Sequence, residues 1–190
     1  IARKSQAIAY QGQHRPMHSP PSVPPLAPVF VVGAPRSGTT MLAAMLGSHS
    51  GYAIGPETQF FSKLAPELLN KAVSDPDWPA LATGMLTGLT LADQSVVELF
   101  GLDLAEVEQY LASREPSIAA MLEALTVPFA ASHGKMGWAE KTPNHLLNLK
   151  RIRSLWPAAR VVRIMRDPRD AAFSACALAA CSDSFAANIY

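Results

Sequence analysis

The sequence predicts an α/β fold with three layers, in which helices cover a central parallel sheet. The continuous apolar run 28–32 (PVFVV), rich in β-branched residues, is typical of a buried parallel strand. Residues 159–165 (ARVVRIM) form a second predicted strand, and 137–141 (GWAEK) is a shorter strand candidate. Helical patterns separate these segments. Strands that alternate with helices along a chain are typical of a parallel sheet.

Residues 1–27 precede the first predicted strand and contain the proline-rich stretch HRPMHSPPSVPPLAP. Proline cannot donate a backbone hydrogen bond and its φ angle is fixed, so we expect an arm or linker here rather than a packed element. The folded domain is therefore predicted to span 28–190.

Helices are predicted where apolar residues recur about every 3.6 positions. The first follows the first strand and ends near Gly47. Residues 57 to about 131 look helical throughout, which predicts a helical insert over about 58–136 between the first and second strands. After 137–141, Thr142 can act as N-cap and Pro143 occupies the first helical position of a helix to about 156. A last helix is predicted to open at the Asp-Pro of 166–180.

The composition excludes several classes of protein. The 190 residues are 49% hydrophobic and 16% charged, which is enough apolar material for a core. The formal net charge of +1 and the scattered basic residues give no reason to expect nucleic-acid binding. No apolar run approaches the roughly 18 residues of a membrane span. The first residues do not resemble a signal peptide, and Cys176 and Cys181 lack the spacing of a zinc or redox motif, so we expect a cytoplasmic protein.

The loop after the first predicted strand has the glycine spacing of a phosphate-binding P-loop but lacks its lysine. A Walker loop is G-x-x-x-x-G-K-[ST]; here Gly33 and Gly38 keep the spacing, and Thr39 stands at the lysine position. Backbone N–H groups at the start of the next helix can still bind an anion. The cation lies earlier, at Arg36, whose guanidinium offers a fork of donors. These residues predict a P-loop-like fold that binds a small phosphate or a phosphosulfate.

A cation follows each of the three predicted strands, namely Arg36, Lys141 and Arg166. Ligands of parallel sheets bind at the carboxyl ends of the strands, so three cations at that edge predict a polyanionic ligand. Asp167 stands where a magnesium-binding acid would end a strand, but Arg166 beside it would repel the ion. We therefore expect no metal site.

Together these motifs resemble those of the sulfotransferases that use 3′-phosphoadenosine 5′-phosphosulfate (PAPS). The stretch APRSGTT (34–40) is similar to their 5′-phosphosulfate loop, and RDPRDAAFS (166–174) is similar to their 3′-phosphate motif. The chain resembles in particular the bacterial branch related to tyrosylprotein sulfotransferases. In that branch a glutamate in a G-x-E-T context follows the loop arginine by 21 residues, as Glu57 of GPET follows Arg36. The resemblance covers about residues 28–175.

The resemblance implies a PAPS-dependent enzyme that uses no metal. Glu57 would be the general base, while Arg36 and Lys141 would stabilise the sulfonyl group in transfer. The nucleotide would be bound by the loop and the second motif: Arg36, Ser37, Gly38, Thr39 and Thr40 at the 5′-phosphosulfate, and Arg166 and Ser174 at the 3′-phosphate. Cytosolic relatives use a histidine two residues after the lysine, where this chain has Pro143, and this departure favours Glu57 as the base.

The residues also leave alternatives open. Glu57 could cap a helix, Lys141 could be an ordinary strand-end residue, and His145 is a further candidate to approach the site. A P-loop kinase or NTPase with an unusual loop is one rival function, and a non-catalytic protein that keeps only the nucleotide site is another. The acceptor (small molecule, glycan or peptide), the oligomeric state, and whether the 190 residues are a fragment of a longer protein are not fixed by the sequence.

Overall fold

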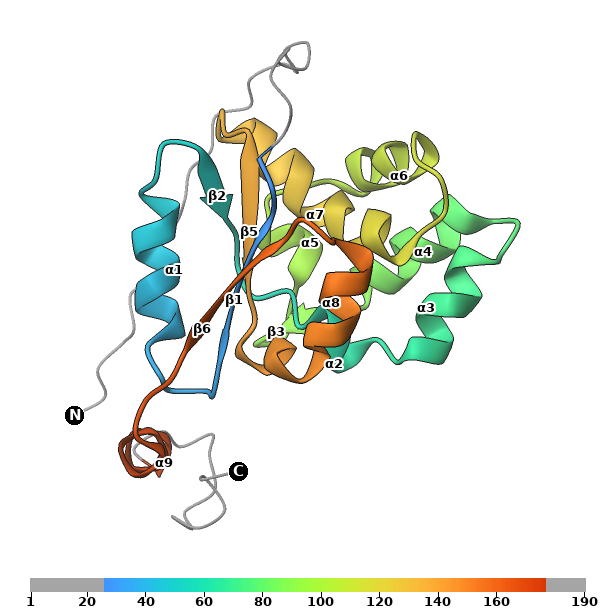
Figure 1. Ribbon diagram of the computed structural model, residues 1–190. Coiled ribbons are helices and arrows are strands. Elements are labelled where there is room, and N and C mark those ends of the chain that lie inside the picture. The colour runs from blue at the N-terminus through green and yellow to red at the C-terminus, as the bar shows by residue number, and fades with distance from the viewer. Residues whose placement is uncertain (1–25, 177–190) are drawn as a thin grey trace, which may run out of the picture.

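The computed structural model describes residues 26–176 as an α/β fold built on a four-stranded parallel sheet (Figure 1). The strand order is β2-β5-β1-β6, and its members are β1 (Val29–Gly33), β2 (Tyr52–Ile54), β5 (Gly137–Lys141) and β6 (Arg160–Ile164). The predicted fold class is confirmed, and the three predicted strands lie within one residue of their expected bounds. β2 is not anticipated by the sequence pattern, because three residues are too few to show a period.

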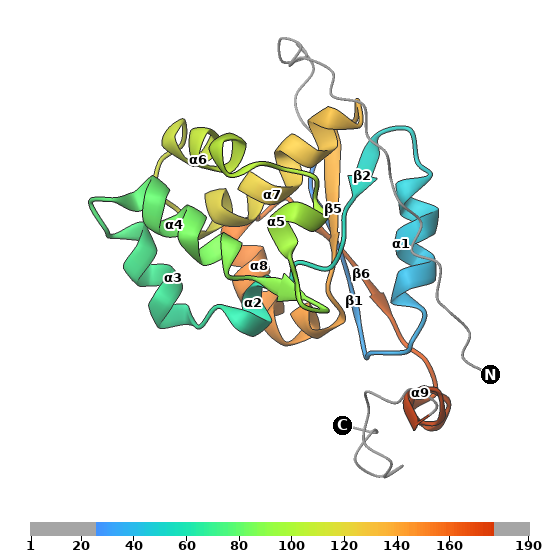
Figure 2. The same cartoon turned by 180° about the vertical axis from the view of Figure 1, so that it is seen from behind.

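Helices lie on both faces of this sheet (Figures 1 and 2). In the described part of the chain, α1 (Thr39–Gly47) covers one face, and α7 (Ile118–Ser132) and α8 (Leu149–Leu155) cover the other. The core on the α7 side contains an aromatic cluster: the ring of Phe30 lies 5.5 Å from that of Trp138 and 5.3 Å from that of Trp156, between centroids. Burial of these large rings is a major source of the hydrophobic free energy of folding.

The segment between β2 and β5 is mostly helical but contains a hairpin. Its helices are α2 (Phe60–Lys63), α3 (Pro66–Val73), α4 (Trp78–Thr87), α5 (Val96–Leu99), α6 (Leu104–Ala112) and α7. The prediction of helix throughout 57–131 is wrong at 90–95, where β3 (Thr90–Leu91) pairs antiparallel with β4 (Gln94–Ser95). Ala92 and Asp93 between them have φ angles of 49° and 65°, as a type I′ hairpin turn requires.

The predicted helix of 142–156 is divided into a 3₁₀ helix, η1 (Pro143–Asn148), followed by α8. The last described helix, α9 (Pro168–Cys176), begins at the predicted Asp-Pro. Residues 1–25 of the predicted arm (1–27), the predicted continuation of the last helix beyond Cys176, and Cys181 lie outside the described residues. Among the helices that are described, none combines the length and apolarity needed to cross a membrane.

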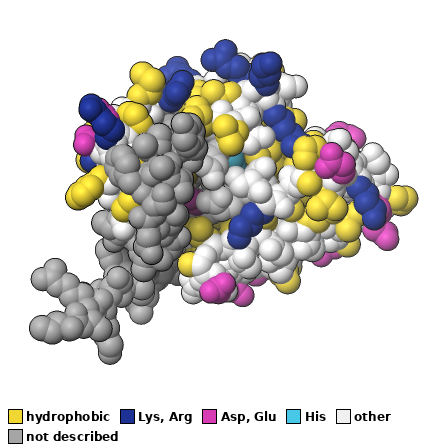
Figure 3. Space-filling model, turned by 90° about the horizontal axis from the view of Figure 1, so that it is seen from below, with side chains coloured by type: hydrophobic (Ala, Val, Ile, Leu, Met, Phe, Trp, Pro, Cys, Tyr) yellow, Lys and Arg dark blue, Asp and Glu magenta, His cyan; other side chains and the backbone are white. Residues whose placement is uncertain are grey.

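β6 lies at one edge of the described sheet, and three of its five residues are exposed. Exposed hydrophobic side chains on and after this strand include Val162, Met165 and Phe173. Seen from the end of the molecule where α9 lies, Lys and Arg side chains are scattered over the visible surface and are not gathered in one patch (Figure 3).

Candidate active site

The loop between β1 and α1 turns through two residues with positive φ. Gly38, the N-cap of α1, has φ 99°, and Arg36 has φ 66°, a region that non-glycine residues seldom adopt. A Cβ at Gly33 would lie 2.7 Å from the carbonyl oxygen of Ile164, so the close approach of β1 to β6 requires glycine there. The loop thus leads directly into the start of α1, whose first N–H groups have no partner within the helix.

A cleft of about 230 Å³ lies beside this loop, and its lining residues are Arg36, Gly38, Thr39, Thr40, Arg166 and Ser174. Arg36 Nε donates to the Ser174 hydroxyl at 3.3 Å, and Arg166 Nη1 donates to the Arg36 carbonyl oxygen at 3.0 Å. Ser37 is buried, and its hydroxyl has no hydrogen-bond partner among the described residues. Two guanidinium groups and a helix N-terminus at one cleft make it a site for an anion.

Glu57 and Lys141 form an ion pair that is joined to the cleft. The Lys141 ammonium donates to Glu57 Oε1 and, at 3.4 Å, to the hydroxyl of Thr40. The other carboxylate oxygen of Glu57 accepts from the side-chain amide of Gln59 at 2.7 Å. Both charged side chains are largely withdrawn from water, with exposed fractions of 22% for Glu57 and 10% for Lys141. Lys141 therefore connects the carboxylate of Glu57 to the start of α1, beside the cleft.

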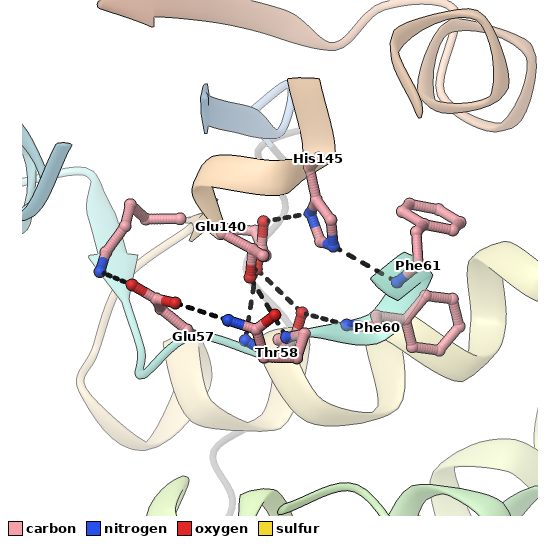
Figure 4. Close-up of polar contacts among 9 residues, drawn as sticks. Glu57, Thr58, Phe60, Phe61, Glu140 and His145 are labelled. Atoms are coloured by element: carbon pink, nitrogen blue, oxygen red, sulfur yellow. Dashed lines mark hydrogen bonds and ion pairs between the residues drawn. The ribbon is translucent and has the colours of Figure 1, made fainter. Parts of the chain in front are cut away.

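Glu140 precedes Lys141 in β5, and because side chains alternate along a strand it points to the opposite face of the sheet. It is 1% exposed, and its carboxylate is held in a network of polar contacts (Figure 4). His145 Nδ1 donates to Oε2 at 2.7 Å, and the hydroxyls of Thr58 and Thr142 donate to Oε1 at 2.8 and 2.6 Å. Burial alone would raise the pKa of Glu140, but the interaction with His145 and the threonine hydrogen bonds lower that pKa below its ordinary value.

The carboxylate of Asp167, which follows β6, is hydrogen-bonded to Arg169. The guanidinium of Arg169 donates to the two carboxylate oxygens at 3.0 and 2.7 Å. The hydrogen bonds from Arg169 lower the pKa of Asp167 to about 2. Within residues 26–176, no group of three His, Cys, Asp or Glu side chains is placed to hold a metal ion.

Comparison with known families shows the family to which the chain belongs. A model described as the sulfotransferase family matches residues 28–187. The chain belongs to the sulfotransferase family. This sulfotransferase chain is 31% identical over 140 residues to the nodulation protein NoeE of Sinorhizobium fredii, a match that covers 73% of the chain and 28% of NoeE. It is 28% identical over 155 residues to an uncharacterized protein of Aquifex aeolicus, covering 80% of the chain and 17% of that protein.

The crystal structure of the sulfotransferase STF9 from Mycobacterium avium is similar with a TM-score of 0.39 and 18% sequence identity, over 87% of the chain and 48% of STF9. The chain thus spans less than a third of the two curated relatives and about half of STF9.

The fold of the chain brings all of its predicted site residues into one connected set. Six of them line the cleft, Ser37 lies within the loop, and Lys141 joins Glu57 to Thr40. The alternative that Glu57 caps a helix is not supported, because its carboxylate contacts the side chains of Lys141 and Gln59. The backbone N–H groups of 58–61 donate instead to side chains of other residues: Glu140, Thr142, Thr58 and His145.

Two sequence-based expectations need correction. His145, a candidate to approach the site, is fully buried and binds Glu140. The Thr142 hydroxyl does not cap a helix, because it donates to Glu140 and accepts from the Gln59 N–H at 3.2 Å. Glu140 itself was missed. The signal for it is its position two residues after Trp138, because residues two apart in a strand share a face. A carboxylate on the same face as a buried tryptophan is rarely unpaired.

Proposed function

We propose that this sulfotransferase transfers the sulfonyl group of PAPS to a hydroxyl or amine of an acceptor, with Glu57 as general base. The observation that carries the proposal is the single connected set described above. An anion cleft formed by Arg36, Arg166 and Ser174 is joined through Lys141 to a carboxylate. The acceptor is proposed to be a small molecule, a glycan or a peptide.

The cleft suits the two charged ends of the nucleotide. The loop and the N-terminus of α1 would hold the 5′-phosphosulfate through the backbone of Gly38 and Thr39 and the hydroxyls of Ser37 and Thr40. The unpartnered hydroxyl of Ser37 supports this assignment, because a buried polar group without a partner is costly unless a ligand supplies one. Arg166 and Ser174 would hold the 3′-phosphate at the other side of the cleft.

The chemistry assigned to the chain is proton removal and charge stabilisation. Bound PAPS would supply the sulfonyl group, whose sulfur–oxygen bond to the 5′-phosphate breaks as the acceptor oxygen or nitrogen bonds to sulfur. Glu57 takes the proton that the acceptor loses. Arg36 and Lys141 stabilise the negative charge that develops on the bridging oxygen and the sulfonyl oxygens. No step requires a metal ion.

The first test is nucleotide preference. Isothermal titration of the chain with 3′-phosphoadenosine 5′-phosphate (PAP) and with ATP plus Mg²⁺ should give binding of PAP and little or none of ATP. Preference for ATP would overturn the proposal in favour of a P-loop kinase or NTPase.

The second test is transfer. We expect radiolabelled PAPS to label a component of a fractionated acceptor pool, and Glu57→Gln to slow labelling by about 10²–10⁴-fold. Glu67→Gln, which changes an exposed acid in α3, is the matched control. Equal rates for wild type and Glu57→Gln would remove Glu57 from its role. PAP binding without transfer to any pool would indicate a non-catalytic nucleotide-binding protein.

A further inference from the structure

We propose that Glu140 and His145 are positioning residues that hold Glu57 against Lys141 by fixing the turn at 57–61 to the end of β5. This inference rests on the proposed function for its role in catalysis, but the positioning itself is a statement about geometry. Neither side chain lines the cleft, since both are buried on the other face of the sheet.

The contacts that fix the turn come in succession along both segments (Figure 4). Glu140 Oε1 accepts from the backbone N–H of Thr58 at 3.4 Å as well as from its hydroxyl. The next residues of the turn at 57–61 contact residues that follow Glu140 in the chain. The Thr142 hydroxyl accepts from the N–H of Gln59 at 3.2 Å. His145 Nε2 then accepts from the N–H of Phe61 at 3.3 Å.

Glu57 and Lys141 are the direct chain neighbours of the first cross-linked residues, Thr58 and Glu140. The cross-links therefore set the distance between the two backbones from which the charged pair extends. A long ammonium side chain on an unsupported strand end would sample many rotamers, whereas a fixed partner backbone restricts them. The contact between the two charged groups is thus a consequence of the buried network behind it.

The hydrogen bonds also fix the pattern of donors and acceptors in the network. The N–H of Phe61 donates to His145 Nε2, and the ring N–H at Nδ1 is donated to Glu140. Glu140 therefore accepts from fixed donors at both oxygens: the N–H of Thr58 at Oε1 and the ring N–H at Oε2. An amide at position 140 would bring an N–H group against one of these donors in either orientation.

The backbone of the turn supports the same conclusion. Gln59 has φ 53°, a conformation that a non-glycine residue adopts only when its surroundings impose it. In this conformation its N–H reaches Thr142 and its side-chain amide folds back onto Glu57 at 2.7 Å. The network thus holds a strained residue whose side chain orients the second oxygen of the Glu57 carboxylate.

The decisive experiment compares two Glu→Gln variants of the full chain. Glu140→Gln changes the network, and Glu123→Gln is the matched control, because Glu123 accepts a hydrogen bond of the same 2.7 Å length from a ring N–H, that of Trp156. Glu123 makes none of the contacts described at the site. We expect Glu140→Gln to lower kcat for transfer from radiolabelled PAPS by about 10²-fold, with the KM for PAPS and the affinity for PAP near wild type. Glu123→Gln should leave kcat near wild type.

A second pair of variants, with smaller changes, tests the inference if Glu140→Gln does not fold. Thr142→Val keeps the shape of the side chain but removes the hydroxyl that binds Glu140 and Gln59, so kcat should fall. Thr142→Ser restores the hydroxyl and should recover most of the loss. The inference is overturned if Glu140→Gln and Glu123→Gln lose kcat equally, if PAP affinity falls in parallel with kcat, or if serine recovers nothing over valine.

Crystal structures of Glu140→Gln and Glu123→Gln separate this inference from the proposed function. In the Glu140 variant the 57–61 turn should be displaced and Glu57 should leave Lys141, whichever reaction the site catalyses. An unchanged turn overturns the positioning role even if the wild type transfers sulfonyl groups. Absence of PAP binding and transfer in the wild type would overturn the proposed function, while a displaced turn would still support the positioning role.

Discussion

Arg36 and Ser174 lie 138 residues apart in the chain, and the Nε of one donates to the hydroxyl of the other at 3.3 Å. The contact ties the loop after β1 to α9, so the two motifs expected to bind opposite ends of a nucleotide meet across a single cleft. A ligand with charge at both ends would bind between groups that the fold has already brought together, which lowers the ordering cost of binding.

Arg36 should matter for its shape as well as its charge. Arg36→Lys keeps a cation in the loop but loses the planar fork, so we expect turnover to fall by about 10²–10³-fold with PAP binding weakened less. Arg163→Lys, an exposed change in β6, is the control. Steady-state transfer from radiolabelled PAPS measures the effect, and wild-type turnover by Arg36→Lys would contradict it.

Arg166 should determine preference for a 3′-phosphate. In Arg166→Ala the affinity for PAP should fall by about 1.5–3 kcal/mol, the value of a charge-assisted hydrogen bond, while affinity for adenosine 5′-phosphate should fall less. Isothermal titration with both nucleotides measures the difference, with Arg163→Ala as the control. Equal losses for the two nucleotides would place the 3′-phosphate away from Arg166.

Gly38 should be needed for its backbone conformation alone. A Cβ there would contact nothing within 4 Å, but at φ 99° any side chain is strained, so Gly38→Ala should destabilise the fold by about 1–2 kcal/mol and weaken PAP binding. Gly84→Ala in α4 also meets nothing within 4 Å and has no positive φ, so it should stabilise by about 0.5–1 kcal/mol. Denaturant unfolding measures both changes, and matching signs would refute the argument.

Tyr110 should make the protein less stable at alkaline pH. Burial, followed by the nearby Glu123 carboxylate, raises the pKa of Tyr110 from 10.0 to about 12. Because the folded state holds the proton more tightly than the unfolded state, this contribution to stability is complete below pH 10 and is lost as the pH rises toward 12. The free energy of unfolding should therefore fall less steeply over this range in Tyr110→Phe than in wild type. A tyrosinate absorbance titration in which Tyr110 ionises near 10 would contradict the prediction.

The parts of the fold that could be predicted are those with a local signal. β1 is a continuous apolar run, and β6 contains the β-branched residues Val161, Val162 and Ile164. The start of α6 shows its capping box, in which Asp103 and Glu106 bind each other's backbone N–H at 2.7 and 3.1 Å. The β3–β4 hairpin was missed because Ala92 and Asp93 occupy a turn where asparagine and glycine are the usual residues.

The candidate site divides in the same way. The loop could be named as a candidate from its glycine spacing, and Glu57, Lys141 and the Arg166–Ser174 pair from their resemblance to sulfotransferase motifs. The network around Glu140 depends on which residues of two distant segments face each other, and a single sequence carries no such information. Thr142 shows the difficulty: the same residue type suits a helix cap and a buried hydrogen bond, and only the position of Gln59 decides between them.

The strand order has a consequence for synthesis of the chain. β1 comes first, yet its two neighbours in the sheet, β5 and β6, are the last strands of the described chain to leave the ribosome. A nascent polypeptide that has reached residue 150 already contains both glycines of the loop between β1 and α1, but it lacks Ile164, which pairs with Gly33 in the sheet. Pairing over such separations is slow and leaves apolar strands open to aggregation. Nucleotide affinity should therefore arise late and abruptly during translation, and a chain released early should depend on chaperones.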